Sequence, residues 1–152
     1  MHFNYIRKYL SNEDLSELKD EITSIEKVSS VELRLCLKKK KGLHLKKMNP
    51  RELAIKEFHK LGMHNTSGKT GLLIFILFDE KQFEIIADEG VNSKIPDTVW
   101  ETIKGHIKNE FSAGNYKEGL VKCLNEMKTV LEKELPPDGS DKNQLPDDIV
   151  IE

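Results

Sequence analysis

The sequence has 152 residues, of which 38% are hydrophobic and 33% charged, and its formal net charge at pH 7 is -2. This length suits a single domain, and the charge balance lacks the basic excess that is typical of nucleic-acid-binding proteins. The longest apolar run, from residue 72 to 78, is far shorter than the roughly 20 residues of a membrane-spanning helix. No apolar leader segment opens the sequence, so we expect a cytoplasmic protein with reduced cysteines and no membrane anchor.

The first part of the chain predicts a strand between two helices. Ser11 is typical of a helix N-cap, and Asp14 stands at the position that completes a capping box. From residue 31 to 37 apolar and polar residues alternate strictly, which predicts a strand with one firmly buried face. Asn49-Pro50 predicts the start of a second helix, because Asn is a favoured cap and Pro is tolerated at the first helical position.

The second part predicts a hairpin followed by two helices. Residues 72–78 are apolar on both faces, which indicates a central strand covered on both sides. A charged turn at residues 79–82 leads into residues 83–87, the expected antiparallel partner. A third helix is expected to begin near Pro96-Asp97, and a fourth to end at Pro136-Pro137.

This element order indicates the fold class. A strand–helix–strand unit is almost always a right-handed parallel crossover, so the first two strands are expected to be parallel and the third antiparallel to the second. Helices on both sides then give an α/β fold, a three-layer α/β/α sandwich with a mixed central sheet flanked by helices. We expect one domain over residues 1–137, followed by an acidic C-terminal tail over residues 138–152.

One motif has a misleading likeness to a phosphate-binding loop. Residues 62–70 read Gly-Met-His-Asn-Thr-Ser-Gly-Lys-Thr, but five residues separate the glycines where such a loop has four. The segment also follows a predicted helix and precedes a predicted strand, whereas a phosphate-binding loop needs a helix N-terminus after its glycines. We therefore expect no nucleotide hydrolysis at this loop.

Polar oxygens are expected to meet at one end of the sheet. The predicted strand directions bring together the starts of the first two strands and the end of the third. The candidate metal ligands at this end are Glu32, Asp88, Glu89, Asn92 and Asp97, with Asn65 and Thr66 facing them from the loop before the second strand. Oxygen-only ligation suits calcium or magnesium rather than zinc. The alternative is that these acidic residues are merely solvated and that Asp97 caps the third helix.

Three further features carry separate hypotheses. Among the five scattered histidines, only His64 is expected near the proposed oxygen cluster. Cys36 lies within the alternating strand and suits a small packed residue better than a nucleophile. The basic stretch from Lys38 to Lys47 is expected to be a solvated loop, with contact to an acidic partner or a lipid surface as the alternative.

Several stretches together resemble the TPM-domain family, which includes thylakoid-lumen acid-phosphatase-like proteins. Residues 70–90 are similar to the central hairpin of that family, and residues 88–97 to the glycine-containing loop after it. The run from Phe111 to Leu120 matches the pattern F-x-x-G-x-Y-x-x-G-L in the family's helix–turn–helix. Residues 141–147 resemble the tail of small cytoplasmic bacterial members. The likeness extends over about residues 32–147.

The resemblance implies an α/β/α sandwich, divalent-cation binding and, by analogy with plant relatives, a weak acid-phosphatase activity. The sequence departs from many relatives in having Asp88-Glu-Gly where they show a glycine-aromatic-glycine pattern. We expect neither the signal peptide nor the membrane anchor of most of the family, so we do not expect its lumenal or membrane-surface roles to carry over by analogy.

Two functions follow as hypotheses. The first is a calcium- or magnesium-binding module, monomeric and non-catalytic or regulatory, that acts through a protein partner. The second is a weak metal-dependent acid phosphatase, in which the cation polarises a phosphoryl oxygen and prepares a water. Arg34 and Arg51 are the only arginines after Arg7, so phosphate would have few bidentate partners. This scarcity favours the first hypothesis.

Overall fold

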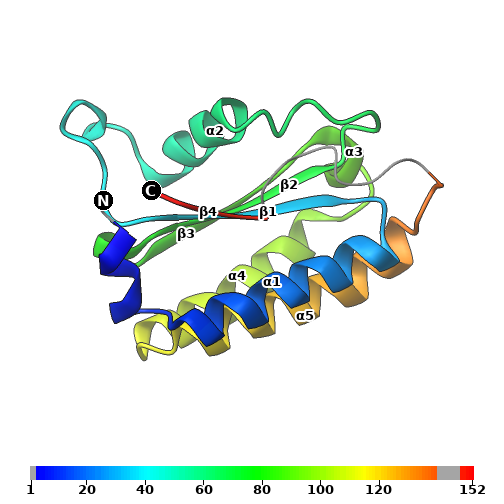
Figure 1. Cartoon of the computed structure of the whole chain (residues 1–152). Helices are drawn as coiled ribbons and strands as arrows, with labels where there is room; N and C mark the ends of the chain where they lie inside the picture. Colours follow the sequence, from blue (N-terminus) through cyan, green and yellow to red (C-terminus); the bar gives the residue numbers. More distant parts are fainter. Residues whose placement is uncertain (1–2, 140–147) are drawn as a thin grey trace.

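The computed structural model describes residues 3–139 and 148–152, which form a four-stranded sheet with helices on both faces (Figure 1). The elements in chain order are η1 (Phe3–Lys8), α1 (Asn12–Val28), β1 (Glu32–Lys38), η2 (Leu43–Leu45), α2 (Pro50–Lys60), β2 (Gly71–Leu77), η3 (Phe78–Glu80), β3 (Gln82–Ala87), α3 (Glu89–Asn92), α4 (Asp97–Ser112), α5 (Tyr116–Glu134) and β4 (Ile149–Ile151). This arrangement confirms the predicted α/β/α sandwich. Within the described residues, no helix combines the length and the apolar character needed to cross a membrane.

The helix starts follow the predicted capping signals. The Ser11 hydroxyl accepts a hydrogen bond from the Asp14 amide at 3.0 Å, and the Asp14 carboxylate accepts one from the Ser11 amide at 2.9 Å. The Asn49 side chain accepts from the Glu52 amide at 2.8 Å at the start of α2, where Pro50 is the first helical residue. Both caps satisfy backbone donors that the helix itself leaves free.

The sheet has the strand order β3-β2-β1-β4. As predicted, β1 and β2 are parallel and β2 and β3 are antiparallel. The fourth strand was not predicted: within the expected tail, Ile149 to Ile151 pair in parallel with Leu35 to Leu37. Residues 141–147, which resemble the tail of the small bacterial members, lie outside the described residues.

The two faces of the sheet differ in how they are covered. Helices α1, α4 and α5 cover one face, and α2 lies on the other (Figure 1). The larger core lies on the three-helix side, where Leu33, Leu35 and Leu37 of β1 meet apolar residues of those helices. The smaller core lies under α2 and contains Leu53, Ala54, Phe58, Met63, Leu73, Phe75, Leu77, Ile86 and the thiol of Cys36.

Polar residues of β1 are buried on the α2 side. Glu32, Arg34 and Cys36 have exposed fractions of 5%, 3% and 0%. These are the residues that alternate with the apolar face of the strand, so both faces of β1 are covered. Buried charged groups are stable only when they are paired or hydrogen-bonded, so Glu32 and Arg34 indicate polar partners on this side of the sheet.

Candidate functional site

Two of the predicted ligands flank the start of β2. Glu32 pairs with Gly71 in the parallel ladder, and its amide donates to the Thr70 carbonyl at 3.1 Å. On the other side of β2, the Asp88 amide donates to the Gly71 carbonyl at 2.9 Å. Glu32 and Asp88 therefore lie at one common rim of the sheet, because β1 and β2 run parallel and β3 runs against them.

The loop between α2 and β2 packs over the middle of this rim. A Cβ on Gly71 would clash with the Met63 carbonyl oxygen, and Met63 is fully buried. Glu32 and Asp88 are separated by two strand spacings, about 10 Å, with Gly71 between them. A single ion held by both carboxylates would need the space that the Met63 carbonyl occupies.

Asp88 lies at the start of α3, a short helix where the sequence predicted only a loop. Its Oδ1 accepts a hydrogen bond from the Glu89 amide at 2.8 Å, so Asp88 is the N-cap of α3. Its Oδ2 is buried and has no hydrogen-bond donor among the residues that the structure describes. Glu89 and Asn92 are exposed on α3. The Asp88 carboxylate thus offers one buried oxygen to a further ligand.

Asn92 and Asp97 line a hollow of ≈ 340 Å³ beside this helix. Asp97 is the first residue of α4 and not its N-cap, which corrects the alternative reading of this residue. The remaining lining residues are Arg51, Ile85, Ala87, Trp100, Glu101 and Lys104. Arg51 and Lys104 both form ion pairs with Glu84, at 3.1 and 3.4 Å. The hollow therefore combines amide and carboxylate oxygens with two cations that already have a partner.

The loop before β2 is stabilised by a hydrogen bond between two of its own residues. The Thr66 hydroxyl accepts a hydrogen bond from the Thr70 amide at 2.9 Å, and Asn65 is exposed. The His64 ring lies 5.0 Å from the His59 ring, and its Nδ1 is buried with no partner among the described residues. The loop connects the end of α2 to β2, the chain order that argues against a phosphate-binding loop.

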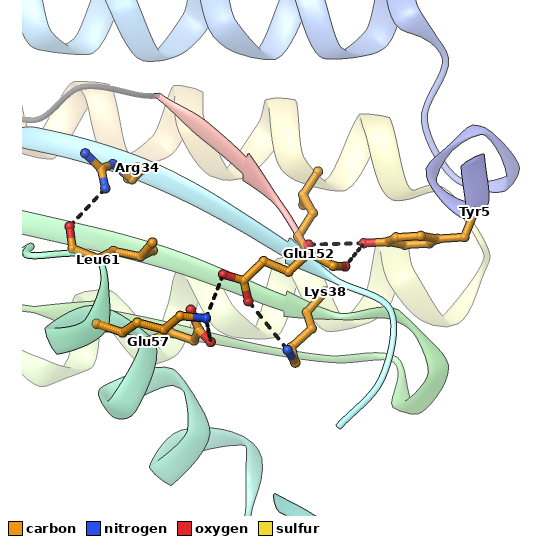
Figure 2. Close-up of polar contacts among 8 residues, drawn as sticks. Tyr5, Arg34, Lys38, Glu57, Leu61 and Glu152 are labelled. Atoms are coloured by element: carbon orange, nitrogen blue, oxygen red, sulfur yellow. Dashed lines mark hydrogen bonds and ion pairs between the residues drawn. The ribbon is translucent and has the colours of Figure 1, made fainter. Parts of the chain in front are cut away.

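A different group of side chains meets the distance requirement for a metal site. Cys36, Glu57 and Glu152 place one ligand atom each within 4.8 Å of one another, and in the described part of the chain no other His, Cys, Asp or Glu group of three does so. None of the predicted carboxylates belongs to it. Figure 2 shows Glu57 of α2 and Glu152, just after β4, on the side of the sheet that faces α2.

Two lysines balance the charge of this second group. Lys60 Nζ lies 3.6 Å from Glu57 Oε1 and 3.3 Å from Glu152 Oε2. Lys38 Nζ lies 3.5 Å from Glu152 Oε1 (Figure 2). Two ammonium groups therefore face two carboxylates, and the resulting network ties β4 and α2 to β1.

Burial controls the protonation of this network. Burial raises the pKa of the Cys36 thiol, and the nearby carboxylates of Glu152 and Glu57 raise it further. Burial also raises the pKa of Glu57, with the charge of Glu152 as the next cause. A thiolate with two carboxylates could hold a zinc-type ion. Such binding would have to remove the thiol proton and displace Lys38 and Lys60, so the arrangement suits an ion-pair network better.

Three further hydrogen bonds, made by Tyr5 and Arg34, join β1 to neighbouring segments. The Tyr5 hydroxyl lies 3.1 Å from the Leu37 carbonyl oxygen and 3.0 Å from that of Glu152. Arg34 Nη1 donates to the Leu61 carbonyl at 3.1 Å, at the end of α2 (Figure 2). The first contact joins η1 to the β1–β4 edge, and the second joins β1 to the loop over the rim.

Sequence reasoning missed this network, although one signal was present. Glu57 lies one helical turn after Leu53 and one before Leu61, on the apolar stripe of α2. A charged residue on such a stripe indicates a buried partner. No comparable signal marks Glu152, because its position depends on the pairing of a three-residue strand.

Comparison with known proteins supports the fold. The sequence model of the TPM domain matches residues 6–130. The NMR structure of the BA42 protein from the psychrophilic bacterium Bizionia argentinensis is similar, with a TM-score of 0.83, 31% identity, and 95% of this chain and 96% of that chain covered. No curated protein matches the chain.

Two more distant structures share the fold alone. The N-terminal domain of a P. gingivalis protein gives a TM-score of 0.71 at 22% identity, covering 84% of this chain and 79% of that chain. The N-terminal domain of the cg2496 protein from Corynebacterium glutamicum gives 0.62 at 10% identity, covering 88% and 78%.

Proposed function

Because the chain belongs to the TPM-domain family, we propose that it binds a divalent cation, calcium or magnesium, and acts as a non-catalytic module through a protein partner. The proposed ligands are oxygens of Asn92 and Asp97, which line the hollow, and of Asp88, which is outside its lining at the start of the same short helix α3. Glu89 lies beside them on α3, and Glu32 adds negative charge at the same rim. These ions prefer carboxylate and amide oxygens.

The observation that carries this proposal is the buried Oδ2 of Asp88. An oxygen that is shielded from water and lacks a donor among the described residues favours a ligand that supplies positive charge. The other oxygen of Asp88 is held by its cap hydrogen bond, which fixes the orientation of the carboxylate. A preoriented carboxylate binds an ion with less loss of side-chain freedom.

Amide chemical shifts measured during calcium and magnesium titrations test the proposal. We expect the largest changes between residues 88 and 97 and a loss of saturable change in Asp88→Asn. The matched control is Asp20→Asn, which removes an exposed carboxylate of α1 and should titrate as the parent does. Absence of any change at millimolar calcium and magnesium would refute cation binding, and changes confined to other residues would refute the site.

Thermal unfolding gives an independent measurement. A ligand present at about one hundred times its dissociation constant stabilises the folded state by roughly 2.7 kcal/mol. For a chain of this size, that stabilisation corresponds to a rise in Tm of about 5–10 °C. The rise should disappear in Asp88→Asn and persist in Asp20→Asn.

The second candidate is a weak metal-dependent acid phosphatase. The observation that favours it is the presence of Arg51 and Lys104 on the same hollow as Asn92 and Asp97, where cations could meet a phosphate. Their existing ion pairs with Glu84 weaken this candidate. It predicts cation-dependent release of phosphate from an aryl phosphate, abolished in Asp88→Asn.

The cysteines also favour a non-catalytic module. Cys36 and Cys123 are both buried. Burial raises the pKa of each thiol, with nearby carboxylates adding to the shift. A nucleophilic cysteine needs an accessible thiolate. Neither thiol therefore suits covalent catalysis.

A further inference from the structure

Charge is distributed very unevenly along the chain. Residues 38–60 contain nine lysines and arginines against two glutamates, a formal charge of +7; since the whole chain carries -2, the remainder carries -9. The overall balance therefore hides a strongly basic segment within an acidic protein. Figure 1 shows this segment, which leaves β1, passes through η2 and forms α2, on the side of the sheet opposite α1, α4 and α5.

The most basic part of the segment is residues 39–47, which we name the basic loop. Lys39, Lys40, Lys46 and Lys47 have no ion-pair partner within the described part of the chain, whereas Lys41 pairs with Glu80. The four unpaired ammonium groups lie within nine residues of one another. Their mutual repulsion is unfavourable in the free protein, and an anionic partner would relieve it.

An exposed apolar side chain lies in the middle of this loop. Leu43 is 82% exposed, and the only other large hydrophobic side chain that is exposed among the described residues is Ile55, at 41%, in the adjoining helix α2. A single exposed leucine is ordinary. Here both exposed apolar residues fall in the one segment that carries the positive charge.

We propose that the basic loop docks the protein onto an anionic lipid bilayer. Its lysines would lie at the phospholipid headgroups, and Leu43 would insert at the boundary between the headgroups and the acyl chains. Lysines attract anionic headgroups, and an apolar side chain gains from leaving water at the bilayer interface. The acidic remainder of the chain is repelled by the same surface, which orients the protein with the basic loop toward the membrane. This docking is independent of the proposed cation site.

The position of Leu43 favours a bilayer over other polyanions. Nucleic acid or an acidic peptide would use the lysines but would leave a leucine at 82% exposure without an apolar contact. A bilayer interface accepts both kinds of group because lipid headgroups and acyl chains lie within a few ångströms of each other. Leu43 therefore provides the variant that separates the two classes of partner.

Vesicle co-sedimentation tests the proposal in the presence of a chelator, so the cation site makes no contribution. We expect binding to vesicles of phosphatidylcholine with about one third phosphatidylserine, little binding to phosphatidylcholine alone, and loss of binding at high salt. Each lysine near an anionic surface contributes about five-fold in affinity. Reversing two charges in Lys46→Glu/Lys47→Glu should therefore lower binding by about 25-fold or more.

The matched control reverses the charges of two exposed lysines on the three-helix face, Lys19→Glu in α1 and Lys133→Glu in α5. It makes the same change in net charge and should leave vesicle binding within about two-fold of the parent. Equal losses in both double variants would show that net charge, and not the basic loop, controls binding. Equal binding to neutral vesicles, or no binding to anionic vesicles at low salt, would also overturn the proposal.

The last arm compares Leu43→Ser on vesicles and on heparin. Loss of an inserted leucine should lower vesicle binding by about ten-fold, while retention on heparin should stay unchanged because the lysines remain. If the serine variant binds vesicles as tightly as the parent, the loop is a general polyanion site and bilayer docking is wrong. A negative result in any of these vesicle or heparin experiments has no bearing on the cation-binding proposal, which the calcium and magnesium titrations test separately.

Discussion

The two faces of the sheet are built by different means. On the three-helix face, strand residues such as Leu35 and Ile74 are fully buried against apolar stripes of α1, α4 and α5. On the α2 face, a smaller apolar core shares its space with buried Arg34 and Glu57. The first face gains stability from apolar burial, and the second adds charged and hydrogen-bonded groups that apolar packing alone does not require.

This difference separates packing from chemistry. The ion-pair network and the basic loop are on or beside the α2 face, where one helix leaves room for loops and polar side chains. The hollow lined by Asn92 and Asp97 lies where Arg51 of α2 and Lys104 of α4 meet Glu84 of β3. Buried ion pairs contribute less to stability than apolar residues of similar volume, so their presence needs another reason. We expect variants in the apolar core of the three-helix face to change stability alone, and variants of the charged groups on the α2 face to change pH response or binding as well.

The largest expected effect is on the three-helix face. Phe111 is 1% exposed and its ring packs against those of Phe83 and Tyr116, at centroid distances of 5.7 and 5.1 Å. Phe111→Ala should lower the free energy of unfolding by about 3–5 kcal/mol, since it removes a buried ring and leaves a cavity. Urea denaturation measures the loss. A loss below about 1 kcal/mol would contradict the tight packing of this face, and exposed Thr129→Ala is the control.

The next effect concerns the loop over the rim. Gly71→Ala should destabilise the protein by about 1–3 kcal/mol, because the new Cβ would meet the Met63 carbonyl and the backbone cannot yield easily. Gly105→Ala is the matched control. A Cβ there meets nothing within 4 Å in the exposed middle of α4, so this variant should gain about 0.5–1 kcal/mol. Stability changes of opposite sign in the two variants would confirm the close approach of the Met63 carbonyl to Gly71, and changes of equal sign would contradict it.

Local patterns explain why most of the fold could be predicted. Alternation over residues 31–37 and the fully apolar run after Gly71 indicate strands, and Ser11 and Asn49 mark helix starts by a hydrogen bond to the nearby backbone. The position of Glu32 and Asp88 at one rim could also be predicted from the connections between the strands. The helical crossover makes β1 and β2 parallel, and the short turn makes β2 and β3 antiparallel. These features depend on short stretches of chain, which sequence patterns report well.

The unpredicted features depend on contacts between distant segments. Strand β4 has three residues and pairs with β1 from more than a hundred residues away. The burial of Arg34 and Glu57 depends on α2 and its following loop, and a polar residue on a strand or helix looks the same in sequence whether it is solvated or paired. The Met63 carbonyl over Gly71 depends on loop conformation, for which the sequence carried no periodic signal.

The pH response should distinguish the faces further. The groups around Glu57 are Cys36, Lys38, Lys60 and Glu152, and burial followed by the charge of Glu152 raises the pKa of Glu57. A raised pKa in the folded state means that stability is greatest while Glu57 is protonated and falls as the pH rises through that pKa. The slope for one proton is at most about 1.4 kcal/mol per pH unit.

Glu57→Gln should remove this part of the pH dependence, because the amide keeps the shape and does not ionise. Denaturant unfolding between pH 4 and 8 in a chelator measures the difference between the variant and the parent. The Glu57→Gln variant should gain stability relative to the parent as the pH rises. The stability of the control Glu132→Gln, on the exposed surface of α5, should change with pH as that of the parent does. A difference in the free energy of unfolding between variant and parent that stays constant across this pH range would contradict the raised pKa of Glu57.

The smallest expected effect tests the attachment of the unpredicted strand. Tyr5→Phe removes the hydroxyl that contacts the carbonyl oxygens of Leu37 and Glu152, and should cost about 1 kcal/mol. Tyr9→Phe is the control, since no hydrogen bond of the Tyr9 hydroxyl occurs within the described residues, although its ring stacks on Phe78 at 4.2 Å. Amide hydrogen exchange should speed up at residues 149–151 in the first variant alone. Equal exchange in both variants would mean that pairing with β1 holds β4 without Tyr5, and that the β4 edge of the sheet depends on backbone hydrogen bonds rather than on this side chain.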